Sequence, residues 1–120
     1  MKKLMAFDLD GTLLFDRKIE PANVQAIHRW QQAGNIAVCA TGKSIFATKL
    51  ALDTADVTFD YNVLYTGAVV TDAEYNILHA QTLSLAVVRA CYERFTKEPG
   101  VALFATTLTH DYRLADNVGS

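Results

Sequence analysis

The stretch MAFDLDGTLL, residues 5–14, passes from a short apolar run directly into two aspartates, a glycine and a threonine. An apolar run bounded in this way is typical of a strand buried on both faces of a parallel sheet, so we expect a strand over residues 3–7. Side chains two residues apart on a strand point the same way, and Asp8 and Asp10 should therefore project together where this strand ends. Gly11 permits the tight backbone exit that such an end requires.

Two carboxylates at the end of a strand favour particular kinds of chemistry. Open α/β sheets bind their ligands at the carboxyl ends of the strands, and paired carboxylates there repel each other unless a hard divalent cation such as Mg²⁺ binds their oxygens. A carboxylate can also attack phosphorus to form an aspartyl-phosphate, while its neighbour handles protons for the leaving oxygen and for water. The plain alternative is two exposed loop acids beside a turn. The D-x-D-G-T pattern arises by chance on the order of once in 10⁵ positions at average composition, which favours the functional interpretation.

A second pattern, AVCATGKS, occupies residues 37–44. A hydroxyl at the end of a strand, followed by glycine at the start of a helix, supplies a side-chain donor and backbone N–H groups for a phosphate. We therefore take Thr41, Gly42 and Lys43 as candidate phosphate contacts. The alternative stays open at this point: Thr41 or Ser44 only caps the helix, and Lys43 is an exposed lysine of its first turn.

The first 80 residues predict alternating strands and helices. Pro21 is expected to open a helix, which Gly34 should end as a left-handed cap. The predicted elements after the first strand are a helix over 22–33, a strand over 35–40, a helix over 43–52 and a strand over 62–65. This order implies right-handed βαβ units and a parallel sheet, so we expect an α/β fold with a Rossmann-like core over residues 1–80.

The pattern changes after residue 67. A polar tetrad separates two short apolar runs, at 68–71 and 76–80, and indicates a hairpin. Ser84 should cap a helix that extends to about Lys97, and a strand is expected over 101–107. Residues 81–120 therefore look like the opening of an α+β module.

Composition excludes several classes of protein. The 120 residues include 11 Lys and Arg against 13 Asp and Glu. The sequence has no basic half or basic stripe, which argues against nucleic acid and anionic membranes as partners. No uncharged stretch approaches the roughly 18 apolar residues of a membrane span, and Asp8 interrupts the N-terminal apolar run too early for a signal peptide. Cys39 and Cys91 lie in apolar patterns, and we expect both to be buried, reduced thiols of a cytoplasmic protein.

These motifs resemble those of the haloacid dehalogenase superfamily of Mg²⁺-dependent phosphohydrolases. The resemblance implies that Asp8 is the nucleophile, that Asp10 is the general acid and base, and that both help to hold Mg²⁺. It also implies that Thr41 is the phosphate-binding hydroxyl of the second motif. The TGKS form, with Thr66-Gly67-Ala68 after the third strand, is similar to the Cof-type sugar-phosphatase branch, in which Asn usually stands where this chain has Thr66. The implied substrate is a small phosphorylated metabolite such as a sugar phosphate.

The resemblance covers only the front part of such an enzyme. The family inserts an α+β cap after the second motif, and residues 81–120 read as its beginning. The third-motif Lys and the fourth-motif acids should lie beyond that cap, so we expect a fragment that lacks full activity alone and leaves a sheet edge open to a second copy. The alternatives are a non-catalytic truncated product, a half that needs a partner chain, and a receiver domain of two-component signalling. A receiver would need an acceptor Asp near residues 65–67, where Tyr, Thr and Gly stand.

Overall fold

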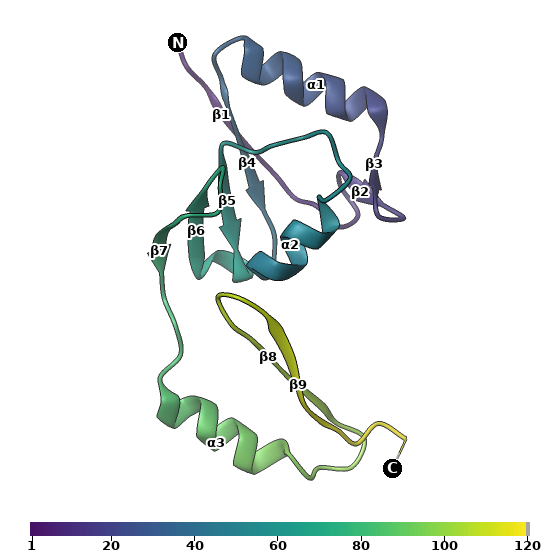
Figure 1. Ribbon diagram of the computed structural model, residues 1–120, viewed down its shortest axis with the longest axis vertical. Helices are drawn as coiled ribbons and strands as arrows, with labels where there is room; N and C mark the ends of the chain where they lie inside the picture. The colour runs from purple at the N-terminus through teal and green to yellow at the C-terminus, as the bar shows by residue number, and fades with distance from the viewer. Residues whose placement is uncertain (120) are drawn as a thin grey trace.

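The computed structural model describes residues 1–119 and shows two parts joined by an extended segment (Figure 1). The first part is a five-stranded mixed sheet with two helices, and the second is a helix with a hairpin. The sheet contains, in spatial order, β1 (Leu4–Phe7), β4 (Ile36–Ala40), β5 (Tyr61–Leu64), β6 (Val69–Asp72) and β7 (Ile77–Ala80). The α/β class expected from the sequence is therefore confirmed.

The parallel half of the sheet brings together the ends of the first two predicted strands. β1 pairs with β4 and β4 pairs with β5, both in parallel, and Phe7 lies opposite Cys39 in the first pair. β6 and β7 continue the sheet as the expected antiparallel hairpin. Because Phe7 and Cys39 are neighbours across the ladder, the segments that leave β1 and β4 begin side by side.

The first strand is an edge strand, and the expectation that it is buried on both faces was wrong. β1 has β4 as its neighbour on one side, and Leu4 and Met5 remain 61% and 44% exposed. The apolar run correctly indicates a strand that can be buried. It carries no information on whether another element covers it.

The helices begin and end at local signals. α1 (Pro21–Gln32) starts with Pro21 in its first turn, and Gly34 follows it with a φ of +88°, as expected. The Trp30 indole N–H donates to the Ile36 carbonyl oxygen at 2.8 Å, which ties α1 to β4. α2 (Ile45–Ala51) begins two residues later than predicted, because Ser44 is its N-cap. Lys43 is therefore a loop residue and not a lysine of the first helical turn.

Most of the core lies between the sheet and the two helices. The buried cluster contains side chains from the loop after β1, from α1, from β4 and from the segment before β5: Leu9, Leu13, Leu14, Ile19, Ile27, Ala37, Cys39, Val57 and Phe59. Leu9 is fully buried, so the turn after β1 is anchored in the core although its acids point outward. The small hairpin of β2 (Leu14–Phe15) and β3 (Lys18–Ile19) extends this turn, and its two-residue strands are too short for a sequence pattern to predict.

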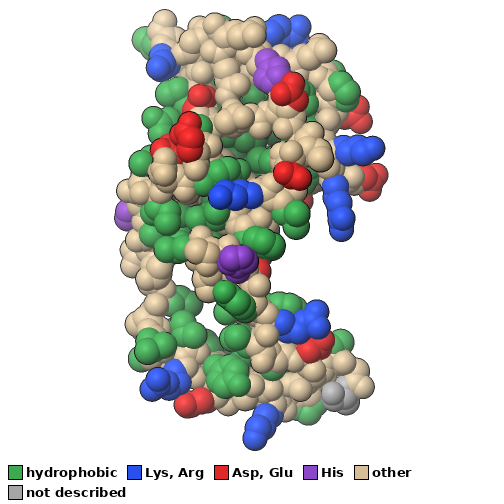
Figure 2. All heavy atoms as spheres, in the orientation of Figure 1, with side chains coloured by type: hydrophobic (Ala, Val, Ile, Leu, Met, Phe, Trp, Pro, Cys, Tyr) green, Lys and Arg blue, Asp and Glu red, His purple; other side chains and the backbone are tan. Residues whose placement is uncertain are grey.

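The second part contains α3 (Leu85–Phe95), β8 (Ala102–Thr106) and β9 (Asp111–Asp116). Ser84 caps α3 through the Val87 N–H, as expected, and β8 pairs with β9, a strand that the sequence reading missed. A hollow of about 800 Å³ separates α3 and this hairpin from the end of the sheet, at the waist seen in Figure 2. Cys91 lies on this helix and is exposed, so the expectation of two buried thiols holds for Cys39 alone. Within residues 1–119, no helix is long and apolar enough to cross a membrane.

Candidate functional site

Asp8 is the first residue after β1, and the turn that follows orients its carboxylate. Asp8 Oδ1 accepts a hydrogen bond from the Leu9 N–H at 2.9 Å, and Oδ2 accepts one from the Thr12 hydroxyl at 3.3 Å. The Leu9 carbonyl oxygen accepts from three successive backbone N–H groups, those of residues 12, 13 and 14. Gly11 has a φ of +77°, which other residues adopt at a cost, so the turn depends on glycine at this position. The turn holds an exposed carboxylate in a defined direction.

Asp10 and Lys43 bring the two sequence motifs together. Lys43 Nζ lies 3.2 Å from Asp10 Oδ2, and the two side chains are 25% and 64% exposed. Lys43 reaches this position from the loop after β4, whereas Asp10 lies in the turn after β1. The ammonium group therefore stands at the carboxyl edge of the parallel strands, next to the segment that carries Asp8.

Thr41 and Gly42 are the first two residues of the loop after β4. Thr41 is 8% exposed, its N–H donates to the Val63 carbonyl oxygen at 3.0 Å, and its hydroxyl oxygen accepts from the Lys43 N–H at 3.2 Å. Because the hydroxyl accepts in this contact, its own proton can be donated to a ligand oxygen. The loop thus presents a hydroxyl, a backbone and an ammonium group within three residues.

The Thr66 side chain lies close to the backbone of Gly42. A Cβ at Gly42 would lie 3.2 Å from Thr66 Oγ1, tighter than an ordinary contact. Thr66 itself has a φ of +56°, a left-handed conformation that is costly for a β-branched residue and easier for Asn. This backbone conformation gives a physical reason for the Asn that usually stands here in Cof-type proteins.

Cys39 lies in the core beside this site and is unsuited to nucleophilic chemistry. Burial, and secondarily the negative charge of Asp8, raises the pKa of the Cys39 thiol from 9.0 to about 12. The thiolate is the reactive form of cysteine, and only about one molecule in 10⁴ carries it at pH 8 when the pKa is near 12.

The two cysteines should therefore differ in reactivity. At pH 8 we expect iodoacetamide to modify exposed Cys91 and to leave Cys39 unmodified, because Cys39 is both buried and protonated. Mass spectrometry of the intact chain should show one adduct, which a Cys91→Ser variant lacks, and two adducts in urea. Two adducts appearing at equal rates in the native chain would contradict the placement of Cys39. Raising the pH toward 12 should increase the labelling of Cys39.

The carboxylates offer the chemistry of a partial metal site. Asp8 and Asp10 carry hard oxygen donors, and Mg²⁺ is usually held by one or two carboxylates together with water and substrate phosphate. Within residues 1–119 there is no group of three or more His, Cys, Asp or Glu side chains that could hold a metal ion. The donor set therefore fits two of the ligands of Mg²⁺, and Lys43 competes for one of them.

Two acidic residues have roles that the sequence did not indicate. The carboxylate of Asp60 accepts from the Ala37 N–H at 2.8 Å and so ties the segment before β5 to β4. Asp111, at the start of β9, accepts from the Ser44 hydroxyl at 3.0 Å. Ser44 and Asp111 are 67 residues apart, and no pattern in either segment predicts that contact.

Comparison with known proteins identifies the class. Residues 5–117 match the haloacid dehalogenase-like hydrolase family, and the chain belongs to this family. A haloacid dehalogenase-like hydrolase from B. subtilis shares 26% identity and a TM-score of 0.69, over 78% of this chain and 33% of that one.

Two further solved structures share the fold of this chain. A subclass IIB sugar phosphatase superposes with a TM-score of 0.72 at 22% identity, over 92% of this chain and 43% of its own. A HAD/COF-like hydrolase from Plasmodium vivax gives 0.76 at 21% identity, over 99% and 44%. The chain therefore shares the fold of less than half of each of these two proteins.

The chain also resembles curated enzymes. It is 36% identical over 89 residues to the HMP-PP phosphatase of Yersinia pestis, a match that covers 73% of this chain. The same match covers 32% of the Yersinia protein, so this chain spans about a third of the length of the curated relatives it matches.

Proposed function

We propose that the chain carries the nucleophile and the phosphate-binding loop of a Mg²⁺-dependent phosphohydrolase that acts on small phosphorylated metabolites. The observation that supports this most directly is the contact of Asp10 with Lys43 at 3.2 Å, because it joins the acidic turn to the loop of Thr41 and Gly42. A carboxylate nucleophile, a second carboxylate and a set of phosphate-oxygen donors then share one edge of the sheet. Family membership adds support from an independent source.

The proposed reaction has two steps. An oxygen of Asp8 forms a bond to phosphorus as the ester P–O bond breaks, and the carboxyl group of Asp10 gives its proton to the leaving oxygen. In the second step the carboxylate of Asp10 accepts a proton from water, whose oxygen attacks the phosphorus. The bond between phosphorus and Asp8 then breaks and inorganic phosphate leaves.

The remaining site residues bind the phosphoryl oxygens in this proposal. The Thr41 hydroxyl donates one hydrogen bond, the backbone N–H groups of the Gly42 loop offer others, and the Lys43 ammonium supplies positive charge. Asp8 and Asp10 would hold Mg²⁺, which supplies charge neutralisation between the nucleophile and the phosphoryl group when bound. Residues 81–120 are then the beginning of a cap that follows the core of residues 1–80. A sugar phosphate is the proposed substrate type within this class.

Magnesium binding should be weak. Only two carboxylates are available, and the Lys43 ammonium must leave Asp10 before the metal can use that oxygen. We expect a dissociation constant in the millimolar range or above, with Asp10→Ala removing the remaining heat in calorimetry and Asp53→Ala leaving it unchanged. Micromolar binding would show that further ligands exist in the chain.

Phosphate binding tests the proposal on the chain itself. With Mg²⁺ present, inorganic phosphate should shift the backbone amide signals of Gly42 and Lys43. The Gly42 N–H is a proposed phosphate donor, and the Lys43 N–H donates to the Thr41 hydroxyl that would bind the phosphate. Thr41→Ala should weaken the response, and the amides of α3 should not move. Shifts confined to residues outside the two loops would contradict the proposed site.

The exposed strand β1 supports a proposal about association. An edge strand with unpaired backbone groups and exposed Leu4 and Met5 invites pairing with another chain, and we propose a second copy as that partner. Light scattering should therefore show a dimer or a larger species. Met5→Lys places a charge on the edge and should shift the chain toward monomer. A stable monomer of the unaltered chain at high concentration would contradict this proposal.

One alternative receives no support from the site. A receiver domain needs an acceptor carboxylate after β5, and the structure has the short 3₁₀ helix Tyr65–Gly67 at that position. A non-catalytic half that requires a partner chain remains compatible with the same phosphate-binding loop. Phosphate binding without turnover by the chain alone would favour that second candidate.

A further inference from the structure

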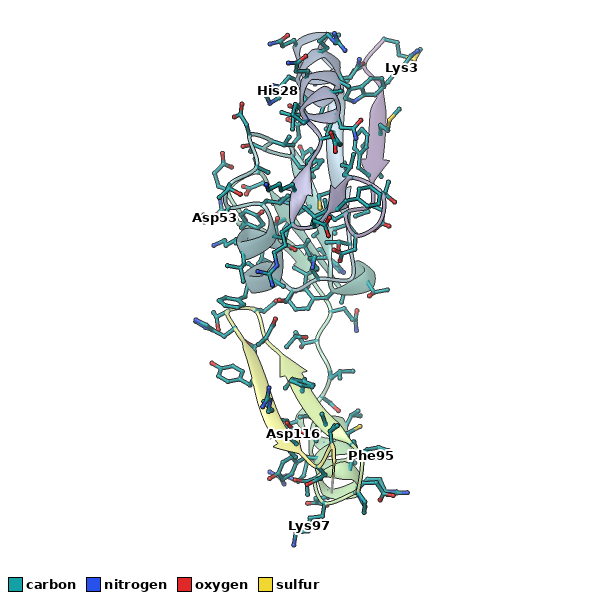
Figure 3. All side chains as sticks on the ribbon, turned by 90° about the vertical axis from the view of Figure 1, so that its right-hand side faces the viewer. Lys3, His28, Asp53, Phe95, Lys97 and Asp116 are labelled. Carbon is teal, nitrogen blue, oxygen red and sulfur yellow. The ribbon has the colours of Figure 1, made fainter. Side chains whose placement is uncertain are left out.

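The second part of the molecule touches the first at the tip of the β8–β9 hairpin (Figure 3). Within residues 1–119, two side-chain hydrogen bonds join the β8–β9 hairpin to residues 1–80. Ser44 donates to Asp111 Oδ2 at 3.0 Å, and the Tyr65 hydroxyl donates to the Thr107 carbonyl oxygen. Elsewhere the two parts are separated by the hollow of about 800 Å³. These two contacts therefore fix where the hairpin tip lies.

Ser44 and Tyr65, which make these two contacts, also hydrogen-bond to the proposed phosphate-binding loop or to the helix after it. While Ser44 donates to Asp111, its oxygen accepts from the Ala47 N–H at 3.0 Å and caps α2 directly after the loop. Tyr65 donates its own backbone N–H to the Lys43 carbonyl oxygen at 2.9 Å. Ser44 is thus bonded both to the hairpin and to the first turn of α2. Tyr65 is bonded both to the hairpin and to the loop of residues 41–44.

Hydrogen bonds within the hairpin tip hold its residues together. The Thr107 hydroxyl oxygen accepts from the N–H groups of Thr109 and His110 at 3.2 and 3.1 Å, and its proton goes to the His110 carbonyl oxygen at 2.9 Å. The His110 ring packs against Phe46 of α2, with the ring centroids 5.4 Å apart. A displacement of the tip would therefore act on Ser44 and Tyr65 together.

We propose that Ser44 and Tyr65 are positioning residues that couple docking of the hairpin to the geometry of the Thr41–Ser44 loop. Their contacts with Asp111 and Thr107 are called the hairpin latch. The mechanical part of this proposal needs no ligand. Its binding part rests on the proposed function, because it takes the loop to be an oxyanion site. Coupling between two sites is reciprocal, so docking of the hairpin should strengthen oxyanion binding by the same factor by which the oxyanion strengthens docking.

Hydrogen exchange tests the latch without ligand. Asp111→Ala removes the acceptor of the Ser44 hydroxyl, and Asp111 is exposed. The backbone amides of Lys43 and Tyr65 should then exchange about fivefold faster, which is the lower end of the usual range of coupling between two sites. Asp111→Asn keeps an oxygen acceptor for Ser44 and should restore slow exchange. Asp116→Ala is the matched control, because Asp116 lies on the same strand and pairs with Arg113 at 3.3 Å, away from the tip.

Phosphate binding tests the coupling. With Mg²⁺ and inorganic phosphate, followed at the Gly42 amide, Asp111→Ala should bind about fivefold more weakly, and Asp111→Asn and Asp116→Ala should bind like the unaltered chain. Tyr65→Phe removes only the hydroxyl contact with Thr107 and leaves Asp111 in place. It should also give faster exchange and weaker phosphate binding, so it tests the proposal even where Asp111→Ala disturbs the hairpin itself.

The outcomes separate the two proposals. If phosphate does not bind at Gly42 of the unaltered chain, the proposed function fails, and exchange at Lys43 and Tyr65 still decides the latch. Unchanged exchange in both Asp111→Ala and Tyr65→Phe would overturn the latch. Faster exchange with unchanged phosphate affinity would overturn the coupling.

Discussion

Replacing Asp8 with Asn should reduce phosphate-ester turnover to background. The amide has nearly the shape of the carboxylate and can still accept from the Leu9 N–H, so the turn after β1 is expected to persist. It lacks the anionic oxygen that would attack phosphorus, and covalent catalysis requires that oxygen. The assay uses a generic phosphate ester with Mg²⁺. It is run on the chain alone and on the chain fused to the part of the Yersinia relative that lies beyond the matched segment.

A nearby acid provides the control for this variant. Asp16 is exposed in the β2–β3 turn with a φ of +50°, a conformation that Asn tolerates well. Asp16→Asn changes the charge of the chain by the same amount and should leave turnover unchanged. Undiminished turnover in Asp8→Asn would overturn the assignment of the nucleophile.

The second large effect is expected for Asp10. Asp10→Asn cannot donate a carboxyl proton to the leaving oxygen or accept one from water, and a positioned acid or base typically contributes 10²–10⁴-fold. Phosphoryl binding should remain, because the loop of Thr41 and Gly42 is untouched and Lys43 is released from its ion pair. Turnover should therefore fall by about 10²–10⁴-fold with little change in the affinity for phosphate.

Thr41→Ala is expected to cause the smallest loss of turnover among the three variants. It removes one neutral donor from a largely buried position, and a loss of about 1–3 kcal/mol is expected. The predicted order of loss is Asp8→Asn, then Asp10→Asn, then Thr41→Ala, from steady-state kinetics on one ester. A loss in Thr41→Ala larger than that in Asp10→Asn would contradict the assigned roles.

Local sequence signals predicted most of the sheet part and the start of α3. The apolar runs, Pro21, Gly34 and Ser84 each act within a few residues, so the strands and helices they mark were found close to their true bounds. The start of α2 was misplaced because Ser44 and Thr41 are both plausible caps, and only the bond from the Ala47 N–H to Ser44 distinguishes them. Short-range chemistry thus identifies elements better than it fixes their ends.

Long-range features could not be predicted in the same way. The exposure of Leu4 and of Cys91 depends on what packs over β1 and α3, and an apolar pattern does not specify its cover. The contact of Asp10 with Lys43, between the turn after β1 and the loop after β4, could be anticipated in outline, because neighbouring parallel strands end at one edge. The contact of Asp111 with Ser44 could not, since it depends on how the hairpin docks.

The most direct test of the account is the position of a covalent phosphoryl group. The chain is incubated with Mg²⁺ and acetyl phosphate at concentrations at which the Gly42 amide shift shows the site to be occupied, then reduced with borohydride and mapped by mass spectrometry. The account predicts a label on Asp8 that requires Mg²⁺ and is absent from Asp8→Asn. A label on another carboxylate, or no label at an occupied site, would contradict it.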